Sequence, residues 1–208
     1  MFEKMTKILQ AGTRGKAVLS TVEVTEHMSR MSAFRPGMYC PPGKYMNLVV
    51  NGELVMSDTS MEHATNTEVI RRAQGSVLVA GLGLGMILIP MARKPEVKSI
   101  LVIEQSQDVV DLVWSQLRKA LKKDARKVTV VCADIFQWPI PKGAKWDVVY
   151  FDIWPNICTD NLKEMATLHR RFARRYTDWM GSWCKDLLKS RKRREDREER
   201  RYRSIWRR

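Results

Sequence analysis

The segment GSVLVAGLGLGMILIPMARKPEVKSILVIE, residues 75–104, constrains the fold more than any other part of the chain. An apolar run leads into Gly81, Gly83 and Gly85, a helical pattern follows, and a second β-rich run ends at Glu104. A strand, a glycine turn, a helix and a strand in this order are typical of the units that build parallel sheets. We therefore predict an α/β fold.

The glycines and the acid each have a physical use in such a unit. A tight turn from strand to helix needs positive φ, and glycine lets the backbone approach a ligand with no Cβ in the way. Glu104 follows Gly85 by 19 residues and ends the next strand, where a carboxylate accepts hydrogen bonds from both hydroxyls of a ribose. The combination predicts a nucleoside site. The alternative is a helix-packing turn and a solvated glutamate.

Two further strands are expected, and each ends near an acid. The run 128–133 leads to Asp134, and the run 146–154 carries Asp152 near its end. Acids at the carboxyl ends of alternating strands fit a doubly wound parallel sheet with its ligand crevice beyond those ends. No strand is predicted after Pro155, so we expect the sheet to be truncated after its fourth strand.

Four regions are predicted along the chain. Residues 1–58 form a β-rich lobe, in which YMNLVV and ELVMS flank Asn51 and Gly52 as a hairpin with a type I′ turn. Residues 59–158 form the ligand-binding domain. Apolar residues recur at spacings of three and four over 159–188, which predicts one long amphipathic C-terminal helix. Its aromatic residues indicate core or interface packing, or secondarily a surface on which bases stack.

The basic charge is concentrated near the C-terminus. The chain carries +14, and residues 169–208 hold 16 Lys and Arg against 6 Asp and Glu, a net charge of +10. The tail, Lys189 to Arg208, is either a solvated extension, helical or disordered, or an arm that contacts RNA or DNA through arginines interleaved with Tyr202 and Trp206.

Composition excludes several other classes. The four cysteines and three histidines are dispersed without metal-ligand spacing, so neither a metal site nor a disulfide framework is expected. The sequence has no run of 18 apolar residues, and its N-terminus lacks the apolar centre of a secretion signal. We expect a cytoplasmic protein with no membrane partner.

Residues 75–155 resemble the class I S-adenosylmethionine-dependent methyltransferase superfamily. VLVAGLGLG looks like the cofactor loop, LVIEQS like the acidic strand end, VVCADIFQW like the adenine-binding segment and WDVVYFDIW like the strand at the reaction centre. The run LVVNGELVMSDTSMEHATN is similar to the hairpin and helix before that loop in the spermidine-synthase-like branch. The resemblance implies a Rossmann-like sheet, S-adenosyl-L-methionine as cofactor, and a homodimer held by the N-terminal lobe.

The resemblance also implies contacts to the cofactor. The three glycines of the loop lie against its methionine portion, and Glu104 accepts the ribose hydroxyls. Asp134 accepts a hydrogen bond from the adenine amine, or, as the alternative, only caps the next turn. The other implied adenosine contacts are Gln105 beside it, the N–H of Ile135 to a ring nitrogen, and Phe136 over the ring.

Asp152 is the candidate catalytic residue. It lies where the resemblance places the nucleophile against the sulfonium, and a carboxylate there orients an amine or hydroxyl and takes its proton. The alternative is an aspartate that only forms the turn before Trp154 and Pro155. Trp154 is expected to provide an aromatic wall for a substrate or a cationic centre.

Three functions are compatible with these features. The leading prediction is methyl transfer to an acceptor that the sequence does not identify. The second is aminopropyl transfer from decarboxylated S-adenosylmethionine, although the DIWPN motif lacks the second acid that aminopropyltransferases carry in the corresponding loop. The third is a non-catalytic nucleic-acid-binding or assembly protein on the same fold.

Overall fold

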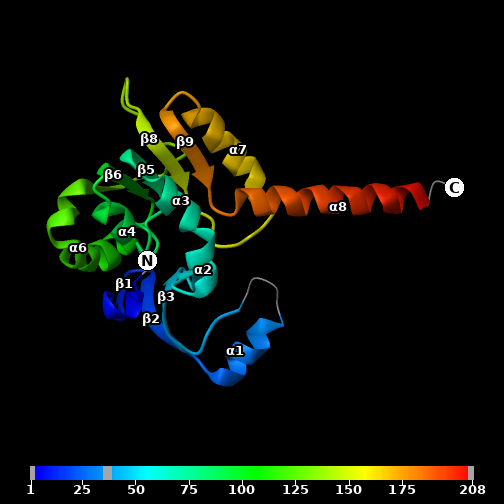
Figure 1. The fold of residues 1–208 in the computed structure, drawn as a ribbon, viewed down its shortest axis with the longest axis horizontal. Coiled ribbons are helices and arrows are strands. Elements are labelled where there is room, and N and C mark those ends of the chain that lie inside the picture. Colours follow the sequence, from blue (N-terminus) through cyan, green and yellow to red (C-terminus); the bar gives the residue numbers. More distant parts are fainter. Residues whose placement is uncertain (1–2, 35–38, 206–208) are drawn as a thin grey trace.

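The computed structural model describes residues 3–34 and 39–205, which form two sheets and the helices around them (Figure 1). The first sheet is antiparallel, in the order β1-β2-β3-β4. The second is parallel, in the order β7-β6-β5-β8-β9. The strands are β1 Gly12–Arg14, β2 Ala17–Val24, β3 Gly43–Val50, β4 Glu53–Ser57, β5 Gly75–Ala80, β6 Val97–Glu104, β7 Val128–Cys132, β8 Trp146–Phe151 and β9 Tyr176–Ser182.

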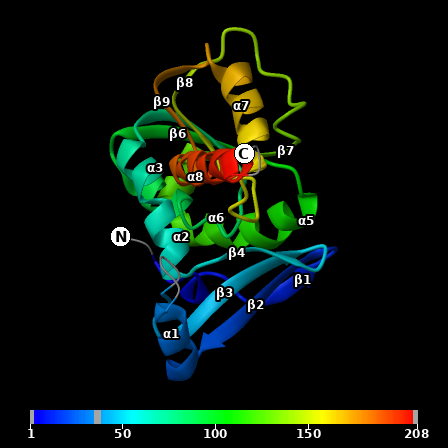
Figure 2. The same ribbon diagram turned by 90° about the vertical axis from the view of Figure 1, so that its right-hand side faces the viewer.

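Helices cover the parallel sheet and connect its strands (Figures 1 and 2). The α-helices are α1 Glu26–Ala33, α2 Ser60–Thr65, α3 Thr67–Arg72, α4 Leu88–Arg93, α5 Gln107–Val109, α6 Ser115–Leu121, α7 Asn161–Phe172 and α8 Lys185–Ile205. A π-helical turn, Val110–Trp114, joins α5 to α6, and 3₁₀ turns lie at Met5–Lys7 and Lys122–Lys127. None of the helices in the described ranges is both long and apolar enough to cross a bilayer.

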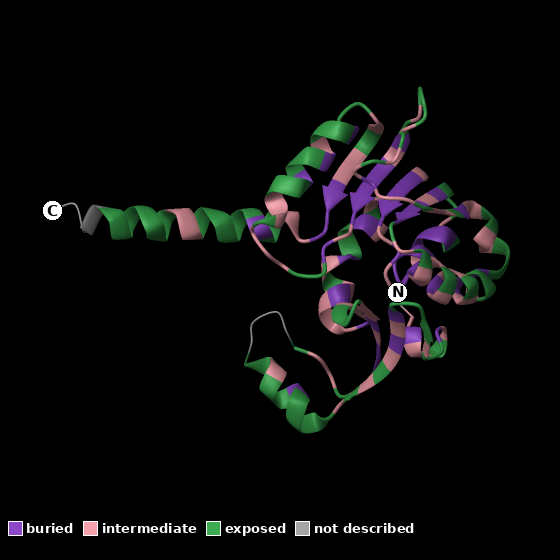
Figure 3. Ribbon diagram, turned by 180° about the vertical axis from the view of Figure 1, so that it is seen from behind, coloured by how far each residue is buried: buried purple, intermediate pink, exposed green. Residues whose placement is uncertain are grey.

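The parallel sheet confirms the predicted Rossmann-like fold. Counted from the central strand β5, its order is 3-2-1-4-5, which is that of a doubly wound nucleotide-binding sheet. Residues 77–80 of β5 have no exposed surface, because the strand lies between β6 and β8 and is covered on both faces. Figure 3 shows the buried residues concentrated in these strands.

The N-terminal sheet contains the predicted hairpin. Asn51 and Gly52 have φ values of 54° and 81°, the left-handed conformation that a type I′ turn needs at both central positions. At the end of β4, the Asp58 carboxylate accepts hydrogen bonds from the backbone N–H groups of Met5 and Met46, at 2.7 and 2.6 Å. Asp58 is 2% exposed and therefore joins the N-terminal segment to β3 from inside the fold.

The prediction of one helix over 159–188, and of a sheet truncated after four strands, is wrong. The segment instead forms α7, the fifth strand β9 and the first turn of α8. β9 pairs in parallel with β8, with Val149 opposite Met180 and Phe151 opposite Ser182. The spacing of apolar residues is helical throughout, but the exposed edge of β8 needs a partner for its backbone groups, and the β-forming residues around Trp179 supply one.

The C-terminal tail is helical as far as the structure describes it. Helix α8 begins within the region predicted as part of an amphipathic helix and continues through the basic segment to Ile205. Figure 1 shows it extending away from the body of the protein. The tail prediction that involves Trp206 lies outside the described residues.

Candidate functional site

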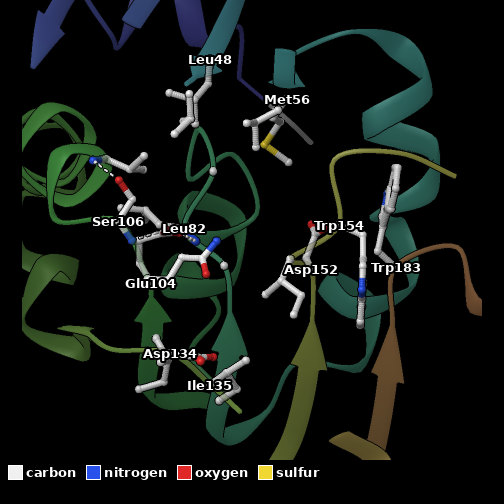
Figure 4. A pocket seen from close by; sticks show the side chains of 18 of the residues that line it. Leu48, Met56, Leu82, Glu104, Ser106, Asp134, Ile135, Asp152, Trp154 and Trp183 are labelled. Carbon is white, nitrogen blue, oxygen red and sulfur yellow. Dashed lines mark hydrogen bonds between the residues drawn. The ribbon is translucent and has the colours of Figure 1, made fainter. Parts of the chain in front are cut away.

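A cavity of about 300 Å³ lies at the carboxyl ends of the parallel strands (Figure 4). The loops after β5, β6, β7 and β8 all contribute to its wall, and Leu48 and Met56 of the N-terminal sheet close it from the opposite side. Met56 also touches the glycine loop, because its sulfur accepts the backbone N–H of Leu84 at 3.3 Å. The hairpin lobe is thus part of the site.

The cavity brings together nearly all the residues predicted for the site. The predicted residues among its lining are Gly81, Gly83, Glu104, Gln105, Asp134, Ile135, Phe136, Asp152 and Trp154. Gly85 is the exception: a Cβ there would lie 2.0 Å from Leu117 Cδ1, so this glycine is needed where the loop packs on α6. At Gly85 the structure favours the helix-packing alternative over a cofactor contact.

The chain that follows the neighbouring strand β8 requires glycine at position 81. Its φ is +97°, and a Cβ at this position would lie 2.0 Å from the carbonyl oxygen of Asp152. The loop after β5 and the loop after β8 therefore touch through their backbones at the floor of the cavity. Only glycine allows this approach.

Glu104 is buried, and its carboxylate is held by backbone. Its two oxygens accept the N–H groups of Leu82 and Ser106 at 2.8 and 2.9 Å. Burial raises the pKa of this carboxyl above its usual range, while these N–H groups act in the opposite direction. Each carboxylate oxygen has a second lone pair, so the group retains acceptor capacity toward the cavity.

Asp134 caps the next turn and also lines the cavity. Its Oδ1 accepts the backbone N–H of Phe136 at 2.9 Å, and its carbonyl oxygen accepts the N–H groups of Gln137 and Trp138, so it does cap the next turn. The same residue lines the cavity with Ile135. Figure 4 shows both on the side of the cavity that carries Glu104.

A second group of acids lies at the other end of the cavity. Asp152 follows β8 and Glu62 comes from α2, and both line the wall. Burial raises the pKa of the Asp152 carboxyl to about 7. Burial and repulsion by Asp152 raise the pKa of the Glu62 carboxyl to about 8. Glu164 of α7 adds an exposed third carboxylate at the same end.

Two tryptophans line this acidic end. Trp154 and Trp183 are 7% and 3% exposed. The indole N–H of Trp154 is donated to Glu164 at 2.7 Å, and that of Trp183 to Thr65 Oγ1 at 3.0 Å. Because both N–H groups have partners within the protein, the cavity meets the carbon surfaces of the rings.

Three residues of the cavity were not predicted from the sequence, namely Glu62, Glu164 and Trp183. A signal existed for Glu62, which lies in helical phase with the buried residues Asn66, Val69 and Ala73, so a charged group stood on an apolar stripe. Glu164 carries no comparable signal. Trp183 was assigned to the amphipathic helix and is placed at the cavity only by strand β9.

The cavity wall is acidic and carries no basic side chain. Among the described residues that line it, five are Asp or Glu and none is Lys, Arg or His. In the described ranges, moreover, no three His, Cys, Asp or Glu side chains are placed to hold a metal ion. The charges of the wall suit a cationic ligand.

Comparisons with known proteins give partial structural likenesses. No family model and no curated protein matches the chain. The methyltransferase CcbJ of Streptomyces caelestis is 18% identical, over 55% of this chain and 43% of that one, with a TM-score of 0.43. Arabidopsis thaliana protein arginine methyltransferase 10 is 19% identical, over 53% and 32%, with a TM-score of 0.41.

The O-methyltransferase TomG of Streptomyces achromogenes, solved in complex with S-adenosylmethionine, is 17% identical over 56% of this chain and 52% of its own, with a TM-score of 0.40. The chain thus spans less than two thirds of each of these proteins. The closer resemblance to the spermidine-synthase-like branch stays a prediction from the sequence.

Proposed function

We propose that this protein is an S-adenosylmethionine-dependent transferase that modifies an amine-bearing acceptor, most simply by methyl transfer. The observation that carries the proposal is the cavity itself. It collects Glu104 and Asp134 at one end and Asp152 with Glu62 at the other, and none of the described residues in its wall is basic. A sulfonium nucleoside has its ribose at one end and its positive charge at the other, and this arrangement matches both.

The residues present fit the cofactor. The retained lone pairs of Glu104 would accept the ribose hydroxyls, and Asp134 with Ile135 would meet the adenine edge. Gly81 leaves the floor free of a side chain beside Asp152. When bound, S-adenosylmethionine supplies an alkyl group already activated by the adjacent sulfonium.

The acidic end would bind and orient the acceptor. An ammonium group fits between Asp152 and Glu62, and the ring surfaces of Trp154 and Trp183 favour a cation near them. A carboxyl with a pKa of about 7 takes up a proton readily near neutral pH, so Asp152 is suited to accept the proton that the amine loses. Holding the acceptor in line supplies much of the remaining rate enhancement.

A second candidate is aminopropyl transfer. The DIWPN loop lacks a second acid, but Glu62 from α2 lines the same cavity as Asp152 and would supply a second carboxylate for a diamine. The cavity also offers no basic side chain, among the described residues, for the carboxylate of a methionine tail. Decarboxylated S-adenosylmethionine has no such carboxylate, and a tighter affinity for it than for the methyl donor would favour this candidate.

Isothermal titration with S-adenosylmethionine and S-adenosylhomocysteine tests the proposal. Glu104→Ala should weaken both affinities at least tenfold, since hydrogen bonds to a charged group contribute about 1.5 to 3 kcal/mol each. Glu104→Gln keeps the shape and one acceptor oxygen, and should fall between Glu104→Ala and the wild type. Glu23→Ala, an exposed change in β2, is the matched control. Absence of binding by both ligands, or equal binding by Glu104→Ala and the wild type, would contradict the proposal.

A further inference from the structure

Near its start, helix α8 is attached to the body by contacts between described residues. Leu188 is fully buried in the first turn. One turn later the Arg191 guanidinium donates to the carbonyl of Ile157 at 2.8 Å, and Thr159 donates to the Glu195 carboxylate at 3.3 Å. Beyond this point the helix continues outward, and nearly all of it is exposed (Figures 1 and 3).

Four basic residues form one stripe on the outward side of this helix. Lys189, Arg193, Arg197 and Arg200 are exposed and are spaced by four, four and three residues. At about 100° per residue, they fall within an arc of roughly 80°. Arg191 and Glu195, which tie the helix to the body, lie about 160° or more from the centre of that arc. The basic stripe therefore faces solvent.

The acids of the exposed part of the helix do not neutralise the stripe. Asp196 pairs with Lys192 at 3.0 Å, Glu198 with Arg194 at 3.9 Å, and Glu199 with Arg203. The fourth acid, Glu195, accepts the Thr159 hydroxyl. Among the described residues, no carboxylate forms an ion pair with a member of the stripe. The ion-paired residues lie on both sides of the stripe, and its four positive charges have no ion-pair partner among the described residues.

The chemistry of the stripe selects its partner. Insertion into a membrane surface needs an apolar face on the helix, and between Lys189 and Arg203 the only apolar side chain is that of Tyr202. Single-stranded nucleic acids are held by aromatic stacking, which the stripe does not offer. The ammonium group of Lys189 and the three guanidinium groups that follow at regular spacing match a regular array of phosphates. Of these three partners, a nucleic-acid duplex fits the stripe best.

The dimensions favour DNA over RNA. A free α-helix is about 10 to 12 Å wide, and the major groove of B-DNA is about 12 Å wide. The major groove of an RNA duplex is too narrow to admit a helix. From Lys189 to Arg200 the stripe runs for about 16 Å along the helix, which covers several phosphates.

We propose that the basic stripe of α8 docks on the phosphates bordering the major groove of double-stranded DNA. The contact is electrostatic and carries no sequence specificity of its own. It is independent of the cavity and of the function proposed for it.

Fluorescence anisotropy with the full chain and a labelled 20-bp DNA duplex tests this proposal. Four phosphate contacts predict a slope of about −3.6 in log affinity against log salt, so affinity should fall roughly 150-fold between 50 and 200 mM salt. The double variant Arg193→Gln, Arg197→Gln should halve the slope and weaken binding at least tenfold at 100 mM salt. The matched control, Lys192→Gln with Arg203→Gln, removes two positive charges that are already paired with Asp196 and Glu199, and should change affinity less than threefold.

Circular dichroism checks that α8 stays helical in both double variants. The same duplex sequence as RNA, one DNA strand alone, and vesicles with 30% anionic lipid serve as competing ligands. Tighter binding to the DNA duplex than to these three supports the proposal. Equal losses in the two double variants, no binding at 50 mM salt, or tighter binding to RNA, single strands or vesicles would overturn it.

Discussion

The buried carboxylates at the two ends of the cavity differ in their hydrogen-bond donors and in their pKa shifts. At the end that carries Glu104 and Asp134, the proposed nucleoside end, Glu104 accepts two backbone N–H groups, which act against the effect of burial on its pKa. At the acidic end, Glu62 has no such donors among the described residues, and its pKa rises to about 8. The first carboxylate is already stabilised by the chain. The second is left to be stabilised by whatever binds beside it.

This difference indicates that the two ends suit different kinds of ligand group. A carboxylate fixed by backbone has one orientation and suits a ligand group of constant geometry, such as a ribose. Two carboxylates with raised pKa values form a site whose charge depends on pH and on the cation bound. Substitutions at the two ends and the pH dependence of diamine binding test that contrast, from the largest expected effect to the smallest.

Gly81→Ala should damage the floor shared by both ends. The substitution forces an alanine to φ near +97° and places its Cβ against the Asp152 carbonyl, so we expect a loss of about 3 kcal/mol in the free energy of unfolding. Gly143→Ala is the control, because φ is +77° there but the space is open, and should cost about 1 kcal/mol. Chemical denaturation measures both. Equal costs would mean that the two loops do not touch at Gly81.

Glu62→Gln should stabilise the protein at high pH. The folded chain holds the Glu62 proton up to about pH 8, whereas the unfolded chain releases it near 4.5, so wild-type stability falls as pH rises between these values. Glutamine cannot ionise. The variant should therefore gain about 2 kcal/mol at pH 9, or roughly 4 to 8 °C in Tm, and nothing at pH 4.

Glu164→Gln, at the exposed rim, is the matched control for this pH dependence and should leave it unchanged. A gain of equal size for Glu62→Gln at pH 4 and pH 9 would show that ionisation is not the cause. The proposed role of Glu62 ionisation in the difference between the two ends would then be wrong.

Binding of a diamine should strengthen with pH. At pH 6 the carboxyls of Asp152 and Glu62 are mostly protonated, and at pH 9 both are charged while an alkyl diamine is still a cation. With S-adenosylhomocysteine present, titration calorimetry should show putrescine affinity rising at least tenfold, or about 1.4 kcal/mol, over this range. Glu62→Gln should reduce the rise. Affinity independent of pH would remove the acidic end as a cation site.

Trp154→Phe should have the smallest effect. It keeps one aromatic ring in the cavity wall but removes the second ring of the indole and the hydrogen bond to Glu164. Because the side chain borders the cavity and Glu164 is exposed, the loss in the free energy of unfolding should be about 1 kcal/mol, measured by thermal denaturation. A loss as large as that of Gly81→Ala would show that the rim is as rigid as the floor.

The same two ends show what could be predicted from the sequence. The nucleoside end is encoded locally: Gly81, Glu104 and Asp134 each follow directly from a strand with a clear apolar pattern, and parallel strands bring such ends together. At the acidic end, Asp152 and Trp154 after β8 were likewise predicted, but Glu62, Glu164 and Trp183 come from α2, α7 and the chain after β9, far apart in sequence. The spacing of apolar residues does not predict contacts between distant elements. Because β9 lies in a stretch with helical spacing, Trp183 was assigned to a helix and not to the cavity.

Gly85 shows a second limit of prediction from the sequence. Its place in the GLGLG motif predicted a ligand contact, whereas a φ of +68° and the packing of Leu117 are what favour glycine there. A motif shows that a position needs glycine but not which neighbour requires it. Only the tertiary structure distinguishes a cofactor from a side chain.

A crystal structure with S-adenosylhomocysteine bound is the most direct test of the site. We predict that both ribose hydroxyls lie on the Glu104 carboxylate, that adenine lies beside Ile135, and that the sulfur faces Asp152. A ligand bound elsewhere, or a ribose that makes no contact with Glu104, would contradict the account.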